Sequence, residues 1–107
     1  MMKTKDEIMQ LSGRDLDAAV MMARNIFYDG NIPHYSTDIA AAWELVEKLI
    51  KPDWAWHFES EWVDGKAQWY ALYWGEDEDG IQDSSNATGD TLPEAISRAF
   101  LLAMAGS

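Results

Sequence analysis

Hydrophobic residues in the first part of the chain recur at intervals of three and four, which is the spacing of an α-helix. The pattern covers residues 4–27 and is interrupted at Ser12-Gly13. Its apolar stripe consists of Leu16, Val20, Ala23 and Phe27. Thr4 and Glu7 have the spacing of a capping box at the start. We therefore expect a helical segment that breaks or bends near Ser12.

A second helix is predicted over residues 36–51, STDIAAAWELVEKLIK. Ser36 is the expected N-cap, and Pro52 follows the expected end as a stop signal. Four residues at helical spacing are expected to share one apolar stripe, namely Ile39, Trp43, Val46 and Ile50. Three consecutive alanines leave room for a neighbouring element to pack closely.

The pattern changes to a period of two from residue 54, which is typical of β-strands. Aromatic and polar residues alternate over residues 54–63, and Asp64-Gly65 predicts a hairpin turn. The returning segment, AQWYALYW, is apolar on both faces, as in an interior strand that is covered on both sides. A polar third strand is expected near residues 81–87, at the edge of the sheet.

A final helix is predicted over LPEAISRAFLLAMA, where Thr91 and Glu94 form a second capping box. The order of elements is therefore two helices, three strands and one helix. We expect a single α+β domain over residues 1–107, built as a three-layer α/β/α sandwich. In it, helices cover both faces of a small antiparallel sheet whose three strands form a meander.

Composition narrows the functional classes. The chain has no cysteine, which excludes disulfides, cysteine nucleophiles and thiolate metal sites. The lysines near the N-terminus are not followed by an apolar run, and the longest apolar stretch, AFLLAMA, is too short to span a bilayer. We expect a soluble protein of a reducing cytoplasm.

The chain carries 19 acidic and 8 basic residues, a formal net charge of −11. This balance disfavours direct binding to nucleic acid or to an anionic membrane. Two interpretations remain open. The charge can serve solubility, or it can mimic nucleic acid if the carboxylates gather on one surface.

No catalytic motif is present: the chain has no G-x-S-x-G, no glycine-rich phosphate loop and no H-E-x-x-H. The acidic turn GEDEDG lacks key carboxylates of a calcium loop. His34 and His57 do not have the spacing of a metal site. We expect no enzymatic activity, no cofactor and no metal.

Two features favour a ligand. The chain has six tryptophans, five of them between residues 54 and 74, and these can form the core, a stacking wall for a planar ligand or an oligomer surface. The start of the second helix, at Tyr35, Ser36 and Thr37, can cap the helix or hold an anion, although Asp38 already occupies the helix dipole.

Three segments of the chain resemble the phage ABA-sandwich domain family: SGRDLDAAV, PHYSTDIAAAWELVEKL and DTLPEAISRAFLLAM. The resemblance covers most of the chain, whereas the strands match only in pattern. It implies an α/β/α layering, a phage or prophage origin and an accessory role inside a bacterium. It implies no catalytic residues.

These observations lead to a hypothesis of a non-enzymatic phage accessory protein, expected to be a homo-oligomer in the host cytoplasm. One form of it sequesters a nucleotide-derived immune signal of the host. The candidate ligand-binding residues are Tyr35, Ser36, Thr37, Trp54, Trp56, Trp69, Trp74, Arg14 and Arg98, with Arg98 or Arg14 as the phosphate partner. The alternatives are an acidic inhibitor or nucleic-acid mimic that blocks a host protein, and a structural or regulatory phage protein.

Overall fold

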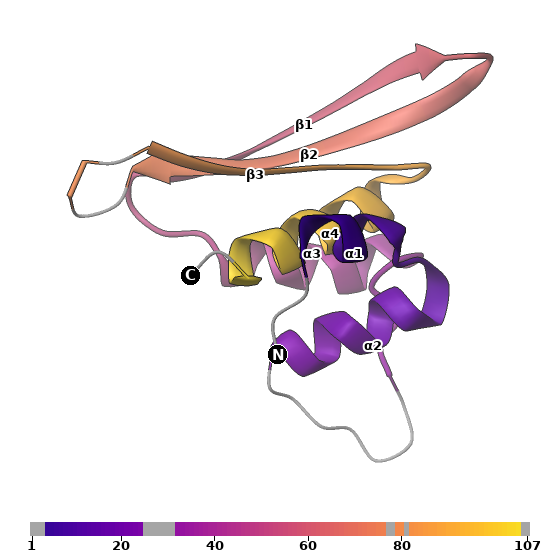
Figure 1. Ribbon diagram of the computed structural model, residues 1–107, viewed down its shortest axis with the longest axis horizontal. Helices are drawn as coiled ribbons and strands as arrows, with labels where there is room; N and C mark the ends of the chain where they lie inside the picture. The colour runs from indigo at the N-terminus through magenta and orange to yellow at the C-terminus, as the bar shows by residue number, and fades with distance from the viewer. Residues whose placement is uncertain (1–3, 25–31, 77–78, 81, 106–107) are drawn as a thin grey trace.

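The computed structural model describes residues 4–24, 32–76, 79–80 and 82–105. These residues form four helices and three strands in the order α1, α2, α3, β1, β2, β3, α4 (Figure 1). The helices are α1 Lys5–Gln10, α2 Gly13–Ala23, α3 Ile39–Lys48 and α4 Leu92–Ala105. The strands are β1 Trp54–Val63, β2 Lys66–Glu76 and β3 Gln82–Gly89. The α+β class and the three-strand meander predicted from the sequence are confirmed.

The sheet is antiparallel throughout, with β2 between β1 and β3. The β1–β2 register runs without interruption from Trp54 opposite Gly75 to Val63 opposite Lys66. The two residues between these strands, Asp64 and Gly65, have φ values of 50° and 79°. Positive φ at both positions is the signature of a tight type I′ turn, so the predicted hairpin is confirmed.

The first helical segment consists of two helices separated by Leu11 and Ser12, which confirms the break predicted near Ser12. Thr4 caps α1: its Oγ1 accepts from the Glu7 amide at 3.2 Å, and Glu7 Oε1 accepts from the Thr4 amide at 3.3 Å. Ser12 precedes α2 without a side-chain capping bond. Phe27, the last residue of the predicted stripe, lies outside the described residues.

The predicted N-cap of α3 is wrong. Asp38 caps this helix, and its Oδ1 accepts from the Ala40 amide at 2.9 Å. Ser36 is buried in the preceding turn, where its amide donates to Asp17 Oδ1 at 2.7 Å. The buried carboxylate of α2 therefore holds this turn in place, and the N-cap lies two residues later than predicted.

The four described helices all lie on one side of the sheet (Figure 1). Helix α4 packs against β2 and β3, and α1, α2 and α3 pack against α4. The sequence predicts helices on both faces because β2 is apolar on both. Its neighbours decide otherwise: beside Leu72, β1 contributes His57 and β3 contributes Asn86. Apolar residues on one strand alone do not make a face that a helix must cover.

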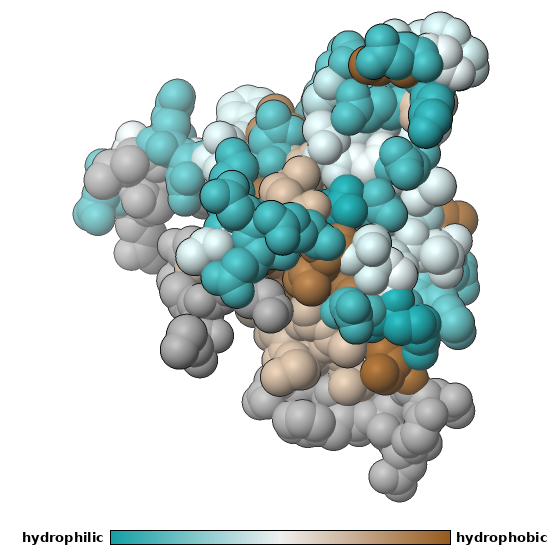
Figure 2. Space-filling model, turned by 45° about the vertical axis from the view of Figure 1, so that its right-hand side comes forward, coloured by the Kyte–Doolittle hydropathy of each residue, from teal (hydrophilic) through white to brown (hydrophobic). Residues whose placement is uncertain are grey.

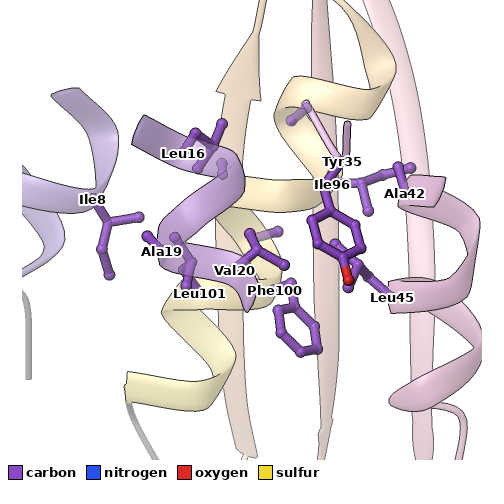
Figure 3. Packing of buried hydrophobic residues seen from close by; sticks show 14 of the residues in the cluster. Ile8, Leu16, Ala19, Val20, Tyr35, Ala42, Leu45, Ile96, Phe100 and Leu101 are labelled. Carbon is purple, nitrogen blue, oxygen red and sulfur yellow. The ribbon is translucent and has the colours of Figure 1, made fainter. Parts of the chain in front are cut away.

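The core lies mainly among the helices, where α4 meets α1, α2 and α3 (Figure 3). Ala71 of β2 and Ala87 of β3 bound it on the side of the sheet. Its labelled members include Leu16, Val20, Leu45, Ile96 and Phe100. The stripe predicted for α3 is wrong except at Val46, because Ile39, Trp43 and Ile50 are 48%, 43% and 66% exposed. The buried side of α3 is instead Ala42, Leu45 and Val46, where the small alanine permits close contact with α4.

Candidate functional site: the open face of the sheet

The two faces of the sheet differ sharply in burial. Toward the helices, Ala71, Tyr73 and Ala87 are almost inaccessible to solvent. On the opposite side no described strand residue is buried. We call this side the open face. Its centre is a stripe of three alternate residues of β2, Tyr70, Leu72 and Trp74.

The strand register explains why this stripe is accessible. Trp74 lies between Ala55 of β1 and Ser84 of β3, both of which are small and exposed. Neither neighbour is large enough to cover the indole, and Trp74 remains 48% exposed. A large aromatic ring bordered by small residues is accessible to a partner without rearrangement of the sheet.

Carboxylates border the stripe. Glu59 and Glu61 of β1 and Glu76 at the end of β2 lie on the open face, and all three are exposed. Among the described strand residues of this face, Lys66 beside the hairpin turn is the only lysine or arginine. The stripe therefore lies in a negative electrostatic environment.

Tyr70 links the stripe to this acidic border. Its hydroxyl donates a hydrogen bond to Glu61 Oε1. This hydrogen bond to the carboxylate raises the pKa of Tyr70 above 10.0, and the nearby charges of Glu61 and Glu59 act in the same direction. The tyrosine is therefore neutral at neutral pH, and its hydroxyl points to the acidic border.

The arginines of the chain do not neutralise the open face, because all three form ion pairs in the helical part. The pairs are Arg14 with Asp17 at 2.8 Å, Arg24 with Glu44 at 3.5 Å, and Arg98 with Glu94 at 3.0 Å. Other exposed carboxylates lie on α1, α3 and the sheet. The described carboxylates thus do not gather on one surface, as a nucleic-acid mimic would require.

The predicted anion site at Tyr35, Ser36 and Thr37 is largely internal. Tyr35 and Ser36 are buried, whereas Thr37 is exposed. The Tyr35 hydroxyl accepts from Arg24 Nη1 at 2.8 Å, and Ser36 Oγ donates to the Gly13 carbonyl at 3.2 Å. These groups join α2 to the turn before α3 and belong to the packing of the helices.

The two predicted phosphate partners also bind protein atoms. Arg14 donates hydrogen bonds to Asp17 and to the Ile32 carbonyl, the latter at 2.7 Å. It also contacts His34 Nδ1 at 3.0 Å. Arg98 donates to the Leu11 carbonyl at 2.9 and 3.1 Å and to the Thr88 carbonyl at 2.8 Å. Each guanidinium therefore joins segments that are distant in the sequence.

The predicted tryptophans divide between the two faces. Trp54, Trp56 and Trp69 lie on the helix side by register, whereas Trp74 lies on the open face. On the helix side, Trp54 stacks on Tyr73 with ring centroids 4.9 Å apart, and Trp56 packs against the same ring at 5.0 Å. These rings form an aromatic cluster between the sheet and α3. The structure does not bring the nine predicted residues together at one site.

The surface view agrees with this distribution. In Figure 2 the upper part of the molecule is mainly teal and near-white, and brown residues appear in separate patches. Tryptophan and tyrosine are close to neutral on this scale, so an aromatic surface appears near-white.

Among the described residues, no group of three or more histidines and acidic residues is arranged to hold a metal ion. No helix in that part of the chain is long and apolar enough to cross a membrane.

Residues 6–101 match the family described as the phage ABA sandwich domain. The chain belongs to this family. The resemblance noted in the sequence is thereby confirmed, and it extends over the strands as well as the helices. Comparison with curated proteins and with solved structures found no match.

Sequence reasoning identified Trp74 as a candidate but missed Tyr70, Leu72 and the three glutamates. Their signal was present in the alternation of the returning strand. It could be interpreted only together with the residues that flank it on β1 and β3. The Asp64-Gly65 turn sets the register of β1 against β2, whereas the register of β3 against β2 is not specified by the sequence pattern.

Proposed function

We propose that this member of the phage ABA sandwich domain family is a non-enzymatic accessory protein that acts by binding another protein. The observation that carries the proposal is the open face, where Tyr70, Leu72 and Trp74 are accessible within an acidic border. Exposed aromatic residues are the residue type that most often dominates protein interfaces. The phage context favours a target in the cytoplasm of the infected bacterium.

This proposal corresponds to the acidic inhibitor considered in the sequence analysis, without nucleic-acid mimicry. Sequestration of a nucleotide-derived signal remains a prediction. Arg14 and Arg98, its expected phosphate partners, are engaged by protein oxygens, and Trp74 lies on the opposite side of the sheet from Trp54. Contact with a protein is therefore better supported by the geometry.

The expected homo-oligomer also remains a prediction. The surface that best fits a contact between two copies is the outer flank of α3, where Ile39 and Trp43 are exposed. The ring centroid of Trp43 lies 5.8 Å from that of Phe58 in the edge strand β1. Light scattering coupled to size-exclusion chromatography tests it directly. Wild type is expected to have more than the monomer mass, and Trp43→Ser is expected to reduce it.

An affinity capture tests the proposed function. The tagged chain is expressed in phage-infected bacteria beside two variants whose fold is checked by circular dichroism. In the test variant Leu72→Ser/Trp74→Ser the open face is altered. The control is Trp62→Ser, which removes an indole that is 76% exposed near the hairpin turn. We expect one or more proteins to be retained by wild type and the control but lost by the test variant. Identical captures with all three chains would refute the proposal.

A further inference from the structure

The open face has the dimensions of a single α-helix. Three strands about 4.8 Å apart present a strip on the order of 10–14 Å wide, close to the diameter of a helix with its side chains. Both backbone edges of β2 are already paired, with β1 and with β3. An occupant above β2 must therefore make contact through side chains.

The stripe also matches the periodicity of a helix. Tyr70, Leu72 and Trp74 are alternate residues of one strand, so their side chains are spaced about 6.8 Å apart. Residues four apart on a helix are spaced about 6 Å along its axis. A helix that lies along β2 can therefore place three successive apolar residues against the stripe.

The negative charges on the open face border one side and one end of the stripe. Glu59 and Glu61 lie on its β1 side, and Glu76 lies at one end. Lys66 lies beyond the other end, and the β3 side offers the uncharged Ser84 and Asn86. Charge complementarity thus requires a basic flank on the side of the helix that lies above β1.

A second copy of this chain does not supply such a helix. Each of α1, α2 and α3 contains one basic and two acidic residues, and α4 contains one of each. Arg14 and Arg98 of these helices, and Arg24 directly after α2, already form ion pairs. A helix of a second copy on the open face would bring acidic residues against Glu59 and Glu61.

We propose that the open face binds a basic amphipathic α-helix of another protein, laid along β2 with lysines or arginines above Glu59 and Glu61. This inference rests on the proposed function and specifies the chemistry of its partner. The bound helix would add an α layer to the free side of the sheet. Helices of this class bury an apolar stripe in a complementary surface, and the carboxylates here would select a basic flank.

The test uses the full chain and three synthetic helical peptides of about four turns. All carry leucines at alternating intervals of three and four. The three peptides differ in one flank of the helix, which carries lysines in the first, glutamines in the second and glutamates in the third. Binding is followed by calorimetry at low and at physiological salt. We expect the lysine peptide to bind roughly ten-fold more tightly than the glutamine peptide, with the preference reduced by salt.

Two charge variants show whether the attraction is local. Glu59→Gln/Glu61→Gln removes two charges from the open face, and Asp6→Asn/Glu47→Gln removes two exposed charges from α1 and α3. The first variant is expected to bind the lysine peptide about ten-fold more weakly than wild type does. The second is expected to leave its affinity unchanged, and Trp74→Ser is expected to abolish binding of every peptide.

Three results would overturn the inference. Equal weakening by both charge variants would indicate unspecific attraction to an acidic protein. Equal affinity for lysine and glutamine peptides, still lost in Trp74→Ser, would leave the open face as a binding surface without the basic specificity. No binding of any peptide would exclude a helical occupant, and the affinity capture described above would then decide the proposed function separately.

Discussion

Replacement of Arg98 by methionine offers the sharpest check on how the fold is held together. The Arg98 side chain is only 12% exposed. Its guanidinium donates to the Leu11 carbonyl, to the Thr88 carbonyl and to Glu94. One side chain thereby joins the end of α1, strand β3 and helix α4. Methionine keeps most of the aliphatic stem but removes every donor.

The expected loss follows from these contacts. A hydrogen bond that involves a charged group contributes about 1.5–3 kcal/mol, and a buried acceptor left without a partner carries a desolvation cost of about 1–3 kcal/mol. The lost hydrogen bonds and the desolvation cost cannot simply be added, because the site is partly exposed and water can reach some of the freed acceptors. We therefore expect Arg98→Met to lower the free energy of unfolding by about 3 kcal/mol, and the melting temperature by roughly 15 °C.

Urea unfolding followed by tryptophan fluorescence and by circular dichroism measures this loss. The matched control is Lys51→Met, which also removes one positive charge from an acidic chain. Lys51 Nζ lies 4.8 Å from the Trp54 ring, and an exposed contact of this kind contributes about 0.5–1 kcal/mol. If the two variants differed by less than about 1 kcal/mol, the proposed clamp would be wrong.

Three further predictions concern packing and pH. Gly75→Ala should destabilise the protein by about 1–3 kcal/mol, because the added Cβ would lie 2.3 Å from the Asp53 carbonyl oxygen; an unchanged urea midpoint would contradict this. Phe100→Ala, at a site that is 1% exposed, should cost about 3–5 kcal/mol in the same assay, whereas Trp62→Ala should stay within about 0.5 kcal/mol. Burial raises the pKa of Tyr73 above 10.0, so the folded state retains this proton more strongly than the unfolded state. The resulting stability is present below pH 10.0 and is lost as the pH rises through the higher folded pKa. Tyr73→Phe should be less stable at neutral pH, since it lacks the hydrogen bond to the Leu49 carbonyl, but its stability should decline less in alkaline urea titrations. Parallel decline of both proteins would count against the assignment.

The candidate site illustrates the limit of pattern reading. From the sequence alone, the apolar side chains of Tyr70, Leu72 and Trp74 predict a second helical layer. The register shows that each is flanked by small or polar residues, such as His57 and Asn86 beside Leu72. The same alternation is compatible with a covered or an open face until the neighbouring strands are known.

Local chemistry decided most of the secondary structure. The capping box at Thr4, the positive-φ turn at Asp64-Gly65 and the start of α4 each depend on residues within a few positions. The sequence therefore determined the order of elements and the fold class.

The tertiary structure decided which sides of these elements are buried. The stripe of Ile39, Trp43 and Ile50 had correct helical spacing, yet α3 turns Ala42 and Leu45 toward α4. Arg14, Ser36 and Arg98 appeared available for a ligand but hold distant segments together. Periodicity indicates that a helix has an apolar side, but burial depends on which neighbour approaches. Only long-range packing determines that.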